Sequence, residues 1–151
     1  MEIGAGILQN EIEKLKEDII NRHTQAGQVA TGRTRAGFEV KMINANHAQL
    51  LGYSYSGVLE KGRKAGKTPK EFREIIERWA IAKGITFQNE AARKRFAYFV
   101  AQKIRREGTK LYRTGGSVDI FTTAIETMKD NLVKQLGNFT TKEIKNNIFT
   151  K

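Results

Sequence analysis

The spacing of the apolar residues changes twice along the chain, and these changes limit the folds that the sequence can adopt. Over residues 5–24 apolar side chains recur every three or four positions, the period of an amphipathic helix. Over residues 37–59 they alternate with polar or small residues, the period of a β-strand. After residue 68 the helical period returns in three further segments. We therefore predict an α+β domain in which a short antiparallel sheet, a hairpin of two to three strands, packs with about four helices. The stripe of the first helix consists of Leu8, Ile12, Leu15 and Ile19.

The two strands are expected on either side of a short polar turn. The first is expected over residues 37–42 and the second over residues 49–59. Between them lies Asn44-Ala45-Asn46, and asparagine tolerates the left-handed backbone of a turn. Tyr53 and Tyr55 would share one face of the second strand. Such rings can stack on nucleic-acid bases, but we expect these two to pack in the core or against another subunit.

The helix after residue 68 has the clearest boundary signals in the chain. Thr68 is a good N-cap, Pro69 is favoured at the first helical position, and Glu71 completes a capping box. Gly84 is expected to end this helix. The face that we expect to be buried consists of Phe72, Ile75, Ile76 and Trp79.

Two more helices are expected in the second half of the chain. One covers about residues 90–107 and ends at Gly108, a loop follows over 109–117, and the other helix starts near Asp119 or Ile120. The inward faces are expected to hold Phe96, Phe99, Val100 and Ile104 in the first, and Phe121, Ile125, Met128, Leu132 and Leu136 in the second.

Gly137 and Asn138 should interrupt the last helix, because both residues favour helix ends. We therefore expect one domain over residues 1–137. A polar tail over residues 138–151 could form another short helix.

Positive charge is concentrated in the middle of the chain. The chain carries 27 lysines and arginines against 16 acids, a net charge of +11. Residues 61–110 contain fifteen basic and five acidic residues, and therefore +10 of the +11. Such an excess attracts a polyanion or an acidic protein surface. The alternative is a solvated basic face that only aids solubility.

The run that starts at Gly62 resembles a nucleotide-binding P-loop, but its spacing is wrong. A P-loop places four residues between its two glycines, whereas three separate Gly62 from Gly66, and Pro69 removes an N–H group at the helix start. The chain has no cysteine, and neither His23 nor His47 has another ligand at metal-binding spacing. We expect no catalytic residue, no metal site and no cofactor, and hence a protein that is not an enzyme.

The helices expected over 69–83 and 90–107 resemble a helix-turn-helix only superficially. That motif joins its helices by three or four residues, and about six or seven lie between these. The basic residues of the second helix are spread around its surface, which favours contact with phosphates over base readout.

The stretch from Tyr53 to Pro69 resembles a known motif. It contains Leu-Glu-Lys-Gly-Arg, then Gly and Pro, and looks like the "Tyr…Leu-Glu-x-Gly-Arg-x-x-Gly-x-x-Pro" stretch of a phage tail-completion and head–tail joining family. In that family a helix with a Trp follows and ends in Lys-Gly, as Trp79 and Lys83-Gly84 do here. A second helix ends in Ile-Arg-x-x-Gly-Thr, as residues 104–109 do. The resemblance covers about residues 5–136.

The resemblance implies a structural virion protein, a ring-forming subunit of the neck or tail-completion complex that connects portal and tail around the DNA channel. Its implied partners are copies of itself, neighbouring portal or adaptor and tail proteins, and double-stranded DNA through nonspecific contacts. Its implied location is the neck or tail of the virion, after synthesis in the cytoplasm of a bacterial host. No apolar run approaches about 18 residues, so we expect no membrane span. The family's Pro-Phe segment after Gly-Thr is replaced by residues 110–117, where we expect a longer loop.

The residues expected at a subunit contact or along the DNA channel are basic: Lys61, Arg63, Lys64, Lys67, Arg93, Lys94, Arg95, Arg105 and Arg106. Those expected to be structural are Glu60, Gly62, Pro69 and Trp79. The alternative function is that of a sequence-nonspecific nucleic-acid-binding accessory protein.

Overall fold

Four long helices, two one-turn helices and one β-hairpin make up residues 3–149, the part of the chain that the computed structural model describes. In chain order the elements are α1 (Ile3–Gln25), α2 (Arg33–Ala36), β1 (Glu39–Asn44), β2 (His47–Leu51), a 3-10 turn η1 (Ser54–Val58), α3 (Phe72–Ala82), α4 (Glu90–Glu107), α5 (Lys110–Arg113) and α6 (Thr122–Phe149). The predicted α+β class, with a short antiparallel hairpin and about four helices, is confirmed.

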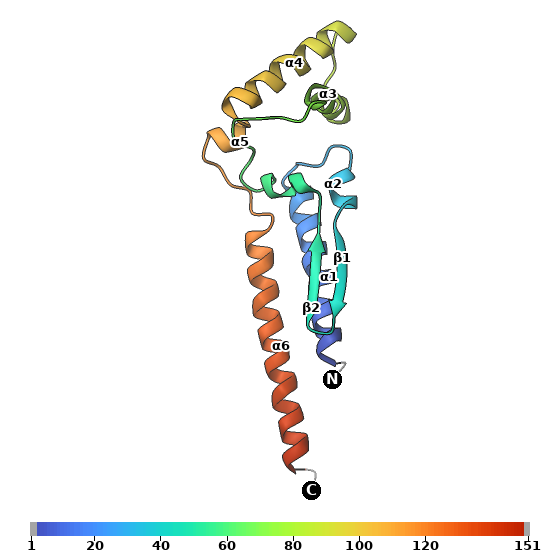
Figure 1. The fold of residues 1–151 in the computed structure, drawn as a ribbon, viewed down its shortest axis with the longest axis vertical. Coiled ribbons are helices and arrows are strands. Elements are labelled where there is room, and N and C mark those ends of the chain that lie inside the picture. Colours follow the sequence, from blue (N-terminus) through green and yellow to red (C-terminus); the bar gives the residue numbers. More distant parts are fainter. Residues whose placement is uncertain (1–2, 150–151) are drawn as a thin grey trace.

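The elements form two regions along an elongated molecule (Figure 1). We call the region built from α1, the hairpin and α6 the body, and the pair α3 and α4 the head. Figure 1 shows the head beyond one end of the body, with the segment before α3 and the one-turn helix α5 between the two regions.

The body is held together by α1 and α6, which pack against each other in opposite directions (Figure 1). The predicted stripe of α1 faces this contact, because residues four apart lie on one side of a helix. Phe38 adds a ring that meets Phe121 edge to face, with 6.4 Å between centroids. The buried residues of this core are Leu15, Ile19, Phe38, Ile120 and Ala124.

The hairpin has the predicted turn but the opposite face of its second strand points inward. The Asn46 N–H donates a hydrogen bond to Asn44 Oδ1 at 2.9 Å, which stabilises the turn. Val40 lies opposite Leu50, and both are half-buried. Leu51 lies at an alternate position from Leu50, on the face that Tyr53 and Tyr55 were expected to share, and it is exposed, because the register of the pairing decides which face of a strand is covered.

The second strand ends at Leu51, and the prediction that it continues to residue 59 was wrong. The chain leaves the sheet at Gly52, where a Cβ would lie 3.0 Å from the Phe38 ring. Tyr53 and Tyr55 then stack on each other at 5.3 Å instead of alternating along a strand. Both side chains are exposed, so they do not pack in the core of this chain, and their packing against another subunit stays a prediction.

The head is packed through small side chains. Ile76 of α3 lies against Ala97 and Ala101 of α4, and Ala80 is fully buried. Alanine lets two helix backbones approach closely, and the side chains of Phe72, Phe96, Val100 and Ile104 close the sides of the contact.

Part of the predicted inward face of α3 and α4 was wrong. Ile75 and Trp79 are each 39% exposed, and Phe99 is 62% exposed. On α3 the contact uses the face through Ile76 and Ala80, and on α4 the face through Ala97 and its neighbours. The helical period alone does not distinguish these faces, because both helices carry apolar residues on more than one side.

The predicted capping box of α3 does not form. The helix begins at Phe72 rather than at Pro69, Glu71 occupies the N-cap position, and among the described residues no side chain caps it. Pro69 instead accepts a hydrogen bond from the Phe72 N–H at 3.2 Å, in a turn that precedes the helix. The predicted end is confirmed, because Gly84 follows the C-cap with φ of 73°.

The predicted break in the last helix was wrong. α6 continues through Gly137 and Asn138 to Phe149. The hydroxyl groups of Thr140 and Thr141 donate to the carbonyls of Leu136 and Gly137, which gives these carbonyls a second partner inside the helix. The predicted loop over 109–117 also contains the one-turn helix α5.

Within residues 3–149, no helix is both long and apolar enough to cross a membrane.

Candidate functional site

Glu60 joins the two regions of the molecule. Its buried carboxylate accepts hydrogen bonds from the Phe121 N–H at 3.2 Å and from the Thr122 hydroxyl, at the start of α6. Its backbone carbonyl accepts the Val118 N–H at 2.8 Å. An anionic side chain at a helix N-terminus satisfies free N–H groups and complements the helix dipole. Glu60 therefore fixes the point at which the chain returns from the head to the body.

The residues that follow Glu60 are hydrogen-bonded to the segment that follows α4. The Arg63 N–H donates to Thr109 Oγ1 at 3.0 Å, and the Thr109 N–H donates to the Arg63 carbonyl at 2.9 Å. A Cβ on Gly62 would lie 2.5 Å from Thr109 Oγ1, and one on Gly108 would lie 2.6 Å from the Arg63 carbonyl. The two halves of the sequence motif, Leu-Glu-Lys-Gly-Arg and Gly-Thr, thus meet in one contact.

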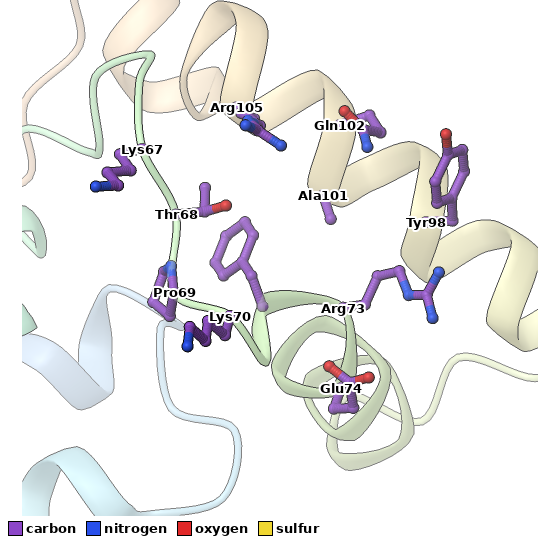
Figure 2. Close-up of a pocket in the computed structure, with 11 residues that line it drawn as sticks. Lys67, Thr68, Pro69, Lys70, Arg73, Glu74, Tyr98, Ala101, Gln102 and Arg105 are labelled. Atoms are coloured by element: carbon purple, nitrogen blue, oxygen red, sulfur yellow. The ribbon is translucent and has the colours of Figure 1, made fainter.

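This fastening holds the basic segment beside α4 and creates a groove. The Gly66 N–H donates to the Arg105 carbonyl at 2.9 Å, and residues 67–70 lead from this contact to the start of α3. The groove between this segment, α3 and α4 has a volume of about 410 Å³. Figure 2 shows Thr68 across from Arg105 and Gln102, with Arg73 extending from α3 towards Tyr98.

Four cationic residues line this groove: Lys67, Lys70, Arg73 and Arg105. Figure 2 shows the Arg73 and Arg105 side chains on the side of the groove, whereas the ammonium groups of Lys67 and Lys70 point away from α4. The guanidinium carbon of Arg73 lies 5.9 Å from the centre of the Tyr98 ring, a cation–π contact that orients the side chain. Glu74 is the single acid among the lining residues. The groove is therefore a concentrated positive site with an aromatic wall.

The structure separates the nine predicted channel residues into groups. Arg63 is half-buried, with its guanidinium on the Phe72 ring at 5.6 Å. Arg93 pairs with Glu77 of α3 at 2.6 Å. Both side chains therefore make contacts that stabilise the head. The groove brings together only two of the nine, Lys67 and Arg105.

The other five predicted channel residues lie outside the groove. Lys94 pairs with Glu90 at 2.6 Å, and Arg106 pairs with Glu107 at 3.1 Å, in exposed ion pairs on α4. The remaining three, Lys61, Lys64 and Arg95, are exposed, lie outside the groove and form no ion pair within residues 3–149.

Four groove residues escaped the sequence reasoning: Lys70, Arg73, Tyr98 and Gln102. The sequence gives little indication that Arg73 and Tyr98 lie together, because their contact depends on how α3 crosses α4. Lys70 was part of the basic segment, but its neighbour Pro69 was assigned to a helix that starts three residues later.

The apparent P-loop does not adopt a phosphate-wrapping shape. The Gly66 N–H is already bound to the Arg105 carbonyl, and α3 starts at Phe72, well beyond the end of the motif. Among residues 3–149, no three histidine, aspartate or glutamate side chains lie close enough to hold a metal ion together.

Three groups in the body have displaced pKa values. The hydrogen bond from Lys14 is the main cause that holds the pKa of Glu11 below its usual value, against the effect of burial. Hydrogen bonds from Thr123 lower the pKa of Asp119. Burial lowers the pKa of His23, and the nearby charges of Arg35 and Lys83 act in the same direction.

Comparisons of the chain with protein-family models, with curated proteins and with solved structures find no match.

Proposed function

We propose that this chain is a structural virion protein of a tailed bacteriophage, a ring-forming subunit of the neck or tail-completion complex. In this role it connects portal and tail around the DNA channel, it performs no enzymatic reaction, and its partners are further copies of itself and the adjoining portal or adaptor and tail proteins. The observation that carries the proposal is the large surface that the chain leaves uncovered.

The chain exposes far more surface than a compact monomer of its mass. A compact 17.1 kDa protein exposes about 7,800 Å², whereas this chain exposes 10,782 Å². The difference is roughly 3,000 Å², and a standard interface covers about 800 Å² on each partner. A ring subunit needs several such contacts, with a neighbour on each side and with the rings above and below.

The exposed surface includes apolar side chains on both regions of the molecule. Phe99 on the head is 62% exposed and Val133 on α6 is 73% exposed. Large apolar side chains gathered at a surface favour contact with other proteins. Other large apolar side chains that are exposed are Ile43, Leu51, Trp79, Ile125, Ile144 and Ile148.

The resemblance to the tail-completion family supports the proposal in a second way. Its two most specific parts, around Gly62 and around Thr109, contact each other directly. Related chains with this fold would be expected to keep the residues that form such a contact. The proposal is therefore consistent with the residues that carry the resemblance.

The test is assembly of the purified chain and its place in the particle. Mass photometry and negative-stain electron microscopy at increasing concentration should detect closed rings or small oligomers without DNA. In virions, antibodies or a fused tag should label the junction of head and tail. A chain that stays monomeric at all concentrations, alone and with portal or tail proteins, would refute the proposal.

The alternative function, a sequence-nonspecific nucleic-acid-binding accessory protein, is favoured by the basic groove. Such a protein would bind duplex as a monomer or dimer and would be absent from purified virions. Finding the chain bound to DNA in infected cells and missing from particles would select this alternative.

A further inference from the structure

The four cations of the groove lack the counter-ions that other basic residues of the head have. Arg93, Lys94 and Arg106 each lie within ion-pair distance of a carboxylate. Across residues 3–149, no carboxylate lies within 4.0 Å of the charged groups of Lys67, Lys70, Arg73 or Arg105. The Arg73 and Arg105 side chains on the side of the groove therefore carry charges that no ion pair neutralises, and these charges would attract an anion in the groove.

The groove also contains the neutral donors that accompany phosphate contacts. Thr68 lies on one wall, and Tyr98 and Gln102 lie on α4 (Figure 2). Phosphate oxygens of DNA are contacted mainly by arginine, lysine and the hydroxyl and amide side chains of serine, threonine, asparagine, glutamine and tyrosine. All the polar residues of the groove except Glu74 belong to these types.

The shape of the groove favours a polymer backbone over a free nucleotide. A mononucleotide site closes around its phosphates with several backbone N–H groups. Here the Gly66 N–H is already occupied, and the groove is an open channel between a chain segment and a helix. The donors lie along the walls and do not converge on one point.

We propose that this groove is a binding site for the phosphodiester backbone of duplex DNA, with Arg73 and Arg105 as its principal phosphate contacts. The site reads no bases, and it holds one strand of the duplex against the head. The choice of duplex DNA as the polyanion rests on the proposed function. The site itself rests on the unpaired cations and the groove.

The test compares two double variants with the same loss of charge. Arg73→Gln with Arg105→Gln removes the groove contacts. Arg78→Gln with Lys103→Gln is the matched control, since it also takes one exposed cation from α3 and one from α4, neither of which lines the groove. Binding of the full chain to a fluorescent duplex is measured by anisotropy over a series of salt concentrations, and circular dichroism verifies the fold.

The groove variant should bind more weakly, and its log–log salt slope should be smaller by about 2, since each phosphate contact contributes about 0.9. The control should keep most of the wild-type slope. If Arg73→Gln with Arg105→Gln fails to fold, Arg105→Gln alone is compared with Lys103→Gln alone, and the expected decrease in slope is about 1. Equal losses in groove and control variants would show diffuse attraction and overturn the site.

Two further outcomes separate this inference from the proposed function. Wild-type duplex affinity in the groove variant, together with lost assembly, would assign the groove to an acidic protein surface and overturn the DNA site. Groove-dependent duplex binding by a chain that never forms rings would keep the DNA site and refute the ring subunit.

Discussion

Gly62 is the residue at which a single added methyl group should do the most damage. Its φ of 78° is unfavourable for any other residue, and a Cβ would lie 2.7 Å from the Tyr112 backbone nitrogen. Gly62→Ala should lower the free energy of unfolding by about 2–4 kcal/mol, from backbone strain and overpacking together. Chemical denaturation measures this change.

Gly57→Ala is the control for Gly62→Ala. No described atom lies within 4 Å of a Cβ placed on Gly57, and its φ is not positive. The free energy of unfolding should change by no more than about 0.5 kcal/mol. Equal denaturation midpoints for the two variants would contradict the contact between Gly62 and the segment after α4.

His23 should make the protein sensitive to mild acid. Within residues 3–149 its buried Nδ1 has no hydrogen-bond partner, and burial lowers its pKa from the ordinary value of 6.5. The unfolded chain then binds more protons than the folded one, so stability should fall as the pH drops through the ordinary imidazole pKa of 6.5 and below. His23→Gln should flatten this fall, and exposed His47→Gln should leave it unchanged. Urea denaturation at several pH values measures it.

At the residue scale, sequence reasoning succeeded where the signal is local. The helix-ending glycines at 84 and 108 both have positive φ, a conformation that side-chain-bearing residues rarely adopt. It failed for Trp79, because a large apolar side chain at helical spacing is compatible with either flank of a helix. The unpaired state of Arg73 and Arg105 depends on the distances to acids that only the fold determines.

At the element scale, the continuity of α6 reverses the expected effect of a substitution. Gly137 lies inside the helix, and no described atom is within 4 Å of a Cβ placed there. Gly137→Ala should therefore raise the free energy of unfolding by about 0.5–1 kcal/mol. If the helix ended at Gly137 in a left-handed conformation, alanine would instead destabilise it. Thermal unfolding followed by circular dichroism distinguishes the two.

Gly84→Ala is the matched control for Gly137→Ala. Gly84 follows the last turn of α3 with φ of 73°. The same change from glycine to alanine should destabilise there by about 1 kcal/mol. A loss of stability at both positions would mean that α6 is broken at Gly137 in solution.

The elements themselves could be predicted better than their boundaries and covered faces. The predicted bounds of α4, about residues 90–107, match those in the structure. The Asn89 side chain caps the helix by accepting the Ala92 N–H, and Gly108 ends it. The second strand was predicted too long, because the alternation of Tyr53 and Tyr55 continues past the glycine where the chain leaves the sheet. Alternation records side-chain character and does not record whether a neighbouring strand is present to pair.

At the scale of the whole molecule, exposed and buried apolar residues should behave oppositely. Phe99→Ser and Val133→Ser should change the free energy of unfolding of the monomer by no more than about 1 kcal/mol, because both side chains are largely solvated. Both should weaken self-association if these surfaces are subunit contacts. Analytical ultracentrifugation and denaturation of the same samples separate the two effects.

Ile19→Ala provides the comparison in the core. Ile19 is 1% exposed and packs within the body, so its truncation should cost about 2–5 kcal/mol. A similar cost at Phe99 or Val133 would show that these side chains are covered within the monomer, and would remove the argument from exposed surface.

The hydrogen bond from the Val118 N–H to the Glu60 carbonyl marks the point at which a long loop of the chain closes. The chain leaves the body after Glu60 and returns to it at Val118, so residues 61–117, which contain the head, form one long loop whose ends meet here. Ile19 and Ile120 of the body core are about one hundred positions apart, and closing so long a loop is slow. The contacts of α3 with α4 are local and form first. During synthesis we therefore expect the hairpin to cover part of the apolar stripe of α1 first, and the core to be completed only after α6 has left the ribosome.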